Sequence, residues 1–119
     1  MKTNNIIQEK SFAFAVRIVE LNRYLSKEKK EFVLSNQVLR SGTSIGANIE
    51  EAIGGQSEKD FFAKLTIAYK EARETKYWLR LLNATSYLEE NIADSLLNDV
   101  EELLRIIGSI QKTIKSRNS

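Results

Sequence analysis

The chain has 119 residues, of which 42% are hydrophobic and 29% are charged, and its formal net charge is +2. This composition is typical of one soluble globular domain, and it excludes an intrinsically disordered chain. The absence of cysteine, histidine and proline excludes disulfides, thiolate or imidazole nucleophiles, cysteine- or histidine-ligated metals and any proline break in a helix.

A first helix is predicted over residues 5–25, because apolar side chains recur there at intervals of three, four and seven residues. Its expected core face consists of Ile7, Phe14, Ile18, Leu21 and Leu25. A second apolar strip on the same helix contains Phe12, Val16 and Val19. This strip either widens the core face or forms an interface between subunits, and the sequence leaves both open.

A second helix is predicted over residues 32–53, and Gly54 and Gly55 mark its end. Its expected core face consists of Leu34, Val38, Ser41, Ile45, Ile49 and Ala52. Gly42 and Gly46 lie inside this helix, although a glycine there costs about 1 kcal/mol of helix propensity relative to alanine. We expect another helix to approach closely at these two positions, which would compensate for that cost.

A third helix is predicted over residues 58–82, and Ser57 and Asp60 form a variant of the capping box at its start. Its expected core face consists of Phe61, Leu65, Ala68, Ala72, Leu79 and Leu82. A polar turn over residues 83–87 follows. Within it, Ser86 and Glu89 indicate a second capping box.

A fourth helix is predicted over residues 90–115, with an acidic first half and a basic end that match the helix dipole. Its expected core face consists of Ile92, Leu96, Val100, Leu103, Ile107, Ile110 and Ile114. Three further apolar residues lie outside this face, namely Leu97, Leu104 and Ile106. They allow the same two interpretations as the apolar strip of the first helix.

Four long helices joined by short connections predict an all-α protein, an antiparallel up-down-up-down four-helix bundle in which residues 1–119 form a single domain. The longest apolar run is far shorter than the roughly 20 residues that a membrane span requires. Residues 1–10 do not read as a signal peptide. We therefore expect a cytoplasmic protein that does not associate with a membrane.

The segment from Gln37 to Glu51 carries an unusual row of polar side chains on the second helix. One face of that helix presents Ser41, Ser44, Asn48 and Glu51, and an overlapping row contains Arg40. Because this row borders expected core positions, its members need hydrogen-bond partners on a neighbouring helix or subunit. We interpret the row, with Gln37, as a structural network that sets packing and register, and a ligand or nucleic-acid contact is the alternative.

The same segment resembles the bacterial ribosomal-RNA intervening-sequence proteins, whose pattern continues into the following helix. The matching residues are Gln37, Arg40, Ser44, Ile45, Asn48, Ile49, Glu51, Ser57, Phe61, Leu65 and Ala68. The sequence departs from the pattern at Leu39, Ala52 and Asp60. The resemblance implies a four-helix bundle that assembles as a homopentamer and has no assigned enzymatic activity. The accessory variability determinant of diversity-generating retroelements is similar in fold, and it forms a pentameric barrel that binds nucleic acid.

A row of cations on the third helix is the main candidate for a functional contact. The expected nucleic-acid contacts are Arg40, Lys70, Arg73, Lys76 and Arg80, accompanied by Tyr69 and Tyr77. The first hypothesis is therefore an oligomer that binds RNA or DNA. The alternative interpretation of this row is a solvated face with local ion pairs such as Asp60–Lys64 and Lys70–Glu74.

The second hypothesis is a homo-oligomeric protein-interaction scaffold that binds no nucleic acid. An enzyme is the third, but its remaining candidates are the carboxylates Glu50, Glu51 and Glu74, with tyrosine, serine or lysine as acid–base partners, and carboxylates on a helix surface are usually just solvated. We therefore expect no catalytic residue, no cofactor and no metal site. We expect Trp78 to be an aromatic of the bundle or of an interface rather than a platform for base stacking.

Overall fold

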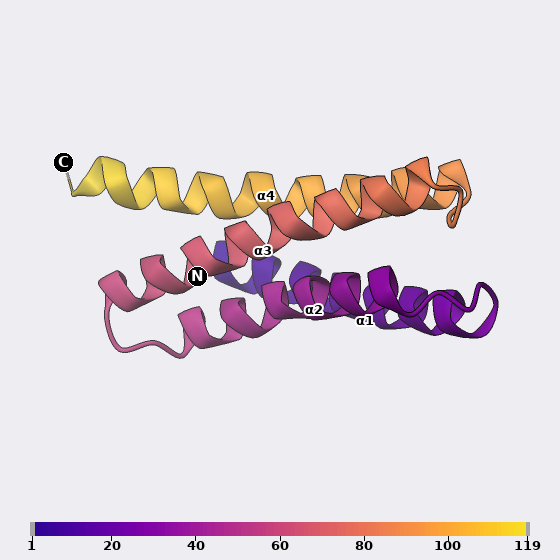
Figure 1. The fold of residues 1–119 in the computed structure, drawn as a ribbon. Coiled ribbons are helices and arrows are strands. Elements are labelled where there is room, and N and C mark those ends of the chain that lie inside the picture. Colours follow the sequence, from indigo (N-terminus) through magenta and orange to yellow (C-terminus); the bar gives the residue numbers. More distant parts are fainter. Residues whose placement is uncertain (1, 119) are drawn as a thin grey trace.

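The computed structural model describes the backbone of residues 2–118 and the side chains of residues 6–118. This part of the chain contains α1 (Lys2–Lys27), α2 (Val33–Ile53), α3 (Glu58–Ala84) and α4 (Glu90–Arg117). Consecutive helices run antiparallel, so both termini lie toward the end of the bundle that carries the α2–α3 loop (Figure 1). The bundle is a rod of 48 × 21 × 21 Å. The predicted all-α four-helix bundle is thus confirmed.

Each helix packs on its neighbours in chain order, and over residues 2–118 the backbones of the diagonal pairs stay farther apart, with no Cα atoms within 8 Å. The α2–α3 pair packs most extensively, whereas α1 and α4 pack least closely. Two ion pairs join α1 to α4: Arg17 Nη1 lies 2.6 Å from Asp99 Oδ2, and Lys10 Nζ lies 3.3 Å from Glu102 Oε1. Surface ion pairs therefore supplement the apolar packing on the α1–α4 side.

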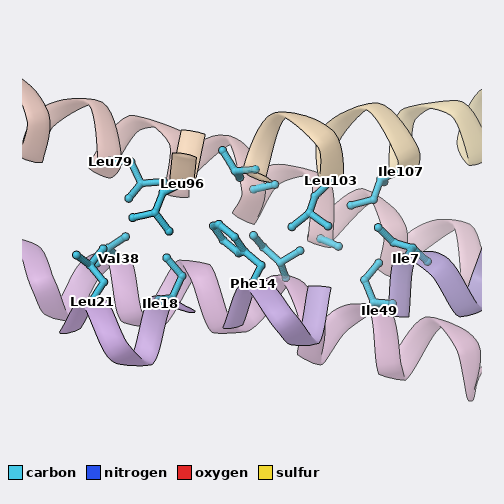
Figure 2. Close-up of a cluster of buried hydrophobic side chains, with 14 of the residues drawn as sticks. Ile7, Phe14, Ile18, Leu21, Val38, Ile49, Leu79, Leu96, Leu103 and Ile107 are labelled. Atoms are coloured by element: carbon cyan, nitrogen blue, oxygen red, sulfur yellow. The ribbon is translucent and has the colours of Figure 1, made fainter. Parts of the chain in front are cut away.

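The predicted core faces are buried with three exceptions. Figure 2 shows apolar side chains of α1 and α2, including Phe14, pointing toward those of α3 and α4. The prediction was wrong for Ile92, which is 41% exposed, whereas Ala93 is fully buried. Helical spacing does not separate the two, because Ala93 and Ile92 lie three and four residues before the buried Leu96. Ile92 instead lies in the first turn of α4, where it lines an open hollow beside Leu21 of α1. Leu34 and Phe61 are only partly buried, at the edge of the core.

The additional apolar residues have different locations on the two helices. On α4, Leu97, Leu104 and Ile106 are partly buried and pack against the core, so they widen its core face. On α1, Phe12 is 68% exposed and Val16 is 45% exposed. Phe12 and Val16 therefore lie at the outer surface of the bundle, whereas Val19, the third residue of the strip, is half-buried.

The glycines of α2 allow α1 to approach closely, as expected. A Cβ atom at Gly42 would lie 2.9 Å from both Cγ atoms of Ile18, and one at Gly46 would lie 3.4 Å from the carbonyl oxygen of Ser11. Real Cβ atoms do not approach other atoms as closely as the first of these distances. Gly42 therefore sets the distance between α1 and α2.

Helix starts agree with the sequence in one case and differ in two. Ser57 Oγ accepts a hydrogen bond from the Asp60 amide at 3.1 Å, which confirms the cap of α3. The second capping box is wrong, because Ser86 has a left-handed φ of 67° and α4 begins only after Glu89. Between them lies the buried Leu88, whose burial holds this segment outside the helix. At α2 the side chain of Glu31 accepts from three successive amides, at 2.8–3.2 Å, a cap that the sequence analysis missed.

Candidate nucleic-acid interface

The polar row of α2 is satisfied partly across helices and partly within its own helix. The buried hydroxyls of Ser41 and of Thr75 on α3 are hydrogen-bonded at 2.9 Å, and Thr75 also donates to the Glu71 carbonyl oxygen at 2.8 Å. The amide of Asn48 donates to the carbonyl and hydroxyl oxygens of Ser44 at 2.9 and 3.0 Å. Thr75 was not singled out in the sequence, because its pairing depends on how α2 and α3 align.

Glu51 pairs across helices with Lys64 of α3, at 2.8 Å between Oε1 and Nζ. The local pair expected between Asp60 and Lys64 is therefore not the one that forms. Its neighbour Glu50 accepts from Gln8 Nε2 of α1 at 3.0 Å. Polar residues at this end of α2 thus connect it to both adjacent helices.

Arg40 lies on the α2–α3 side of the bundle, within a network of polar side chains. Its guanidinium pairs with Glu74 and with Glu71, the latter at 3.4 Å, and donates to Gln37 Oε1 at 3.1 Å. Glu74 also accepts from Trp78 Nε1 at 2.9 Å, so it is not paired with Lys70 as expected. Carboxylates therefore already neutralise Arg40 and hold it away from the other predicted cations.

Three of the remaining predicted cations, Arg73, Lys76 and Arg80, meet in an open groove between α3 and α4, with a volume of about 490 Å³. We call this the α3–α4 groove. Its lining consists of Tyr69, Arg73, Lys76, Tyr77 and Arg80 from α3 and Glu101, Leu104 and Arg105 from α4. Lys70 is exposed next to this row but does not line the groove.

Positive charge dominates the α3–α4 groove, which has four basic and one acidic side chain. Lys76 pairs with Glu101 across the groove. Within residues 2–118 no carboxylate pairs with Arg73, Arg80 or Arg105. An adjoining hollow of about 760 Å³, nearer the α3–α4 loop, shares Lys76, Tyr77 and Arg80 and adds Asp94. The three unpaired guanidinium groups therefore give the groove a positive field.

Arg105 is the groove residue that the sequence analysis missed. It is the only base in the α4 segment between Glu90 and Ser109, which otherwise carries acidic residues. The signal available in the sequence was that Arg105 is a single base among acidic residues. It follows Glu101 by one helical turn and lies next to the partly buried Leu104. Arg105 and Arg73 line the same groove because of the alignment of α3 with α4. Helical periodicity carries no information about that alignment.

Other kinds of site were sought over the same part of the chain. Residues 2–118 contain no group of three or more aspartate, glutamate, cysteine or histidine side chains that could hold a metal ion. No helix in this range is long and apolar enough to cross a membrane.

Similarity to known proteins extends over nearly the whole chain. The family model of the 23S rRNA-intervening sequence protein matches residues 3–109. The crystal structure of a protein of unknown function from the S23 ribosomal protein family, from Bacteroides thetaiotaomicron, is 53% identical in sequence. The match covers 92% of this chain and 98% of that one, with a TM-score of 0.91. No curated protein matches the chain. With its polar row on α2, the chain belongs to the 23S rRNA-intervening sequence protein family.

Proposed function

We propose that this protein is a non-enzymatic, oligomeric nucleic-acid-binding protein, and that the α3–α4 groove is its contact surface. The observation that supports this proposal is the set of three groove arginines, Arg73, Arg80 and Arg105, that no carboxylate neutralises. Guanidinium groups present planar, bidentate donors that suit phosphate oxygens. A cytoplasmic location, where RNA and DNA are accessible, is part of the same proposal.

The contact is expected to be weak in one protomer and stronger in an oligomer. Each neutralised phosphate releases condensed counterions, so three arginines give a slope of about −2 in log affinity against log salt concentration for a single strand. Several copies of the groove on one assembly raise the overall affinity without new contacts, provided that they engage one nucleic acid simultaneously.

Reversing two charges in the groove is expected to abolish binding. The variant carries Arg73→Glu and Arg80→Glu, two exposed residues without internal partners, so folding is expected to be unaffected. Removing two phosphate contacts lowers the salt slope by about 1.5 to 2 and the affinity by at least about tenfold. The measurement is fluorescence anisotropy of labelled RNA and DNA over a salt series, with circular dichroism to verify the fold.

The matched control reverses the same amount of charge away from the groove, at Arg23 and Lys27 of α1. Since neither residue lines the α3–α4 groove, Arg23→Glu with Lys27→Glu is expected to retain most of the binding. An equal loss in both variants would mean that net charge rather than the groove matters. No binding by the wild type at low salt would refute the proposal.

A second candidate function is a homo-oligomeric scaffold that binds no nucleic acid. It is supported by the exposed strip on α1, where an aromatic and a β-branched side chain one turn apart face solvent, Phe12 at 68% and Val16 at 45% exposure. Surface apolar residues that cluster mark protein–protein contacts more often than scattered ones do.

Phe12→Glu with Val16→Glu is expected to dissociate such an assembly into monomers of 13.6 kDa, because charges buried at an interface without partners are costly. Light scattering measures the mass, and the proposed assembly is a homopentamer with five times the mass of the monomer. Phe32→Glu with Val33→Glu is the matched control, because it changes the same residue types at exposed positions of another helix. A monomeric wild type, or an equal effect of both pairs, would exclude this interface.

A further inference from the structure

We infer that the α3–α4 groove takes an unpaired nucleic-acid strand, with a base stacked on Tyr77, rather than a duplex. This inference rests on the proposed function of the same groove and names its ligand class. It starts from the tyrosines, because their rings offer a stacking surface that phosphate binding does not require.

Aromatic and cationic side chains alternate along the edge of α3 that lines the groove. Tyr69, Arg73 and Tyr77 follow one another at intervals of four residues, and Arg80 continues the row. Aromatic platforms interleaved with cations are the recurrent arrangement of proteins that bind single strands, in which bases stack while phosphates pair with arginine or lysine. The pattern therefore offers both contacts within one groove.

Tyr77 is the accessible platform of the two. It is 55% exposed, whereas Tyr69 is partly buried beside Gly108, where an added Cβ would lie 3.8 Å from Cε2 of the Tyr69 ring. The ring of Tyr77 is also held by a neighbouring aromatic residue. It makes an edge contact with Trp78, at 5.1 Å between ring centroids. A stacked base would therefore meet a side chain that is already positioned, which lowers the entropic cost of binding.

The support of Tyr77 extends into the α2–α3 interface. Trp78 donates through Nε1 to Glu74, and Glu74 is held by Arg40 of α2. Arg40 was predicted as a phosphate contact, but it pairs with Glu74 and so helps to position Trp78 beside Tyr77. This chain of contacts also makes Trp78, the only tryptophan of the sequence, a natural reporter of events at Tyr77.

The shape of the bundle disfavours a duplex at this groove. A helix that reads the base edges of a duplex enters its major groove, which is about 12 Å wide, but α3 packs against both α2 and α4. The groove volume of about 490 Å³ is that of a small-ligand pocket rather than of a double helix. From Tyr69 to Arg80 the groove extends for about 17 Å of helix axis, a length suited to a few unpaired nucleotides.

The test compares one strand in two states. A labelled, unstructured RNA of about ten nucleotides, and the same strand annealed to its complement, are titrated with the full-length protein while anisotropy and Trp78 fluorescence are recorded. The single strand is expected to bind at least about fivefold more tightly, and to change Trp78 fluorescence, because stacking adds to phosphate pairing.

Substitution of the platform separates stacking from charge. Tyr77→Leu is expected to weaken single-strand binding by about five- to a hundredfold and to leave the duplex within about twofold. Tyr77→Phe is expected to retain the wild-type affinity, since the ring and not the hydroxyl stacks. Tyr24→Leu, which changes a 40% exposed tyrosine of α1, is the matched control and is expected to have no effect.

The outcomes distinguish this inference from the proposed function. Equal binding of strand and duplex, or tighter binding of the duplex, with Tyr77→Leu unaffected, would overturn the inference and leave the nucleic-acid function standing. Binding of neither form would overturn both. A loss for Tyr77→Phe equal to that for Tyr77→Leu would also contradict stacking.

Discussion

Phe14→Ala is expected to lower the free energy of unfolding by about 3–5 kcal/mol, the usual cost of removing a large aromatic side chain from a core. Phe14 is 2% exposed and lies where α1 faces the opposite helices, beside side chains such as Leu103 (Figure 2). A domain of this size has a total stability of about 5–15 kcal/mol. The variant is therefore expected to be marginally stable, with a much lower urea midpoint, monitored through Trp78 fluorescence and circular dichroism.

The control lies two residues earlier on the same helix. Phe12→Ala removes the same atoms from a side chain that is 68% exposed, and it is expected to change monomer stability by less than about 0.5 kcal/mol. Unfolding is measured at several protein concentrations, because an interface at Phe12 would make its effect depend on concentration. A loss below about 1 kcal/mol for Phe14→Ala would contradict a close-packed core at this position.

Helical periodicity was sufficient to predict the core. Residues such as Ile18, Ile45 and Leu79 are fully buried because a single apolar stripe on each helix has only one way to avoid water. The errors lie at helix starts. Around Ser86 and Ile92 the apolar pattern covers less than one helical turn, so it does not fix the first residue of α4. The burial of Leu88 in the preceding segment decides where α4 begins.

The candidate site was less accessible to sequence analysis than the core. The basic row of α3 was visible as a spacing, but whether each cation is free depends on which carboxylate the neighbouring helix places beside it. Arg40 of α2 pairs with Glu74 of α3, and Lys76 of α3 pairs with Glu101 of α4. Arg73 instead lines the groove together with another arginine, Arg105. These differences come from the axial alignment of the packed helices. The same apolar stripes could be buried in several axial registers, so the stripes alone do not determine which charged side chains meet.

The close approach of α1 to α2 depends on Gly42, and a double-mutant cycle with Ile18 measures the dependence. In the wild type, a methyl group at position 42 would lie 2.9 Å from Cγ1 and Cγ2 of Ile18 and 3.3 Å from its Cβ. A β-branched side chain cannot turn away at χ1 without strain. Gly42→Ala is therefore expected to cost about 1–3 kcal/mol of overpacking, reduced by up to about 1 kcal/mol of improved helix propensity.

The control is Gly46→Ala on the same face of α2. There the nearest atom would be the Ser11 carbonyl oxygen at 3.4 Å, at the limit of ordinary contact, so the gain in helix propensity is expected to leave stability unchanged or raised by up to about 1 kcal/mol. Equal destabilisation by both alanines would indicate that α1 and α2 resist any added methyl group, not one at Gly42 specifically.

Ile18→Ala alone is expected to cost about 2–5 kcal/mol, because it leaves a cavity where a fully buried side chain was. In that background the two Cγ atoms at 2.9 Å are gone and only the Cβ at 3.3 Å stays close to an alanine at position 42. The new methyl group then fills part of the cavity. Gly42→Ala is then expected to stabilise Ile18→Ala by about 1 kcal/mol, a reversal of its sign in the wild type. Additive effects in denaturant unfolding would refute direct contact between these two positions. A reversal would show that position 42 needs glycine because a larger residue would collide with Ile18. Glycine there lets α1 pack against α2, the helix that carries the polar row.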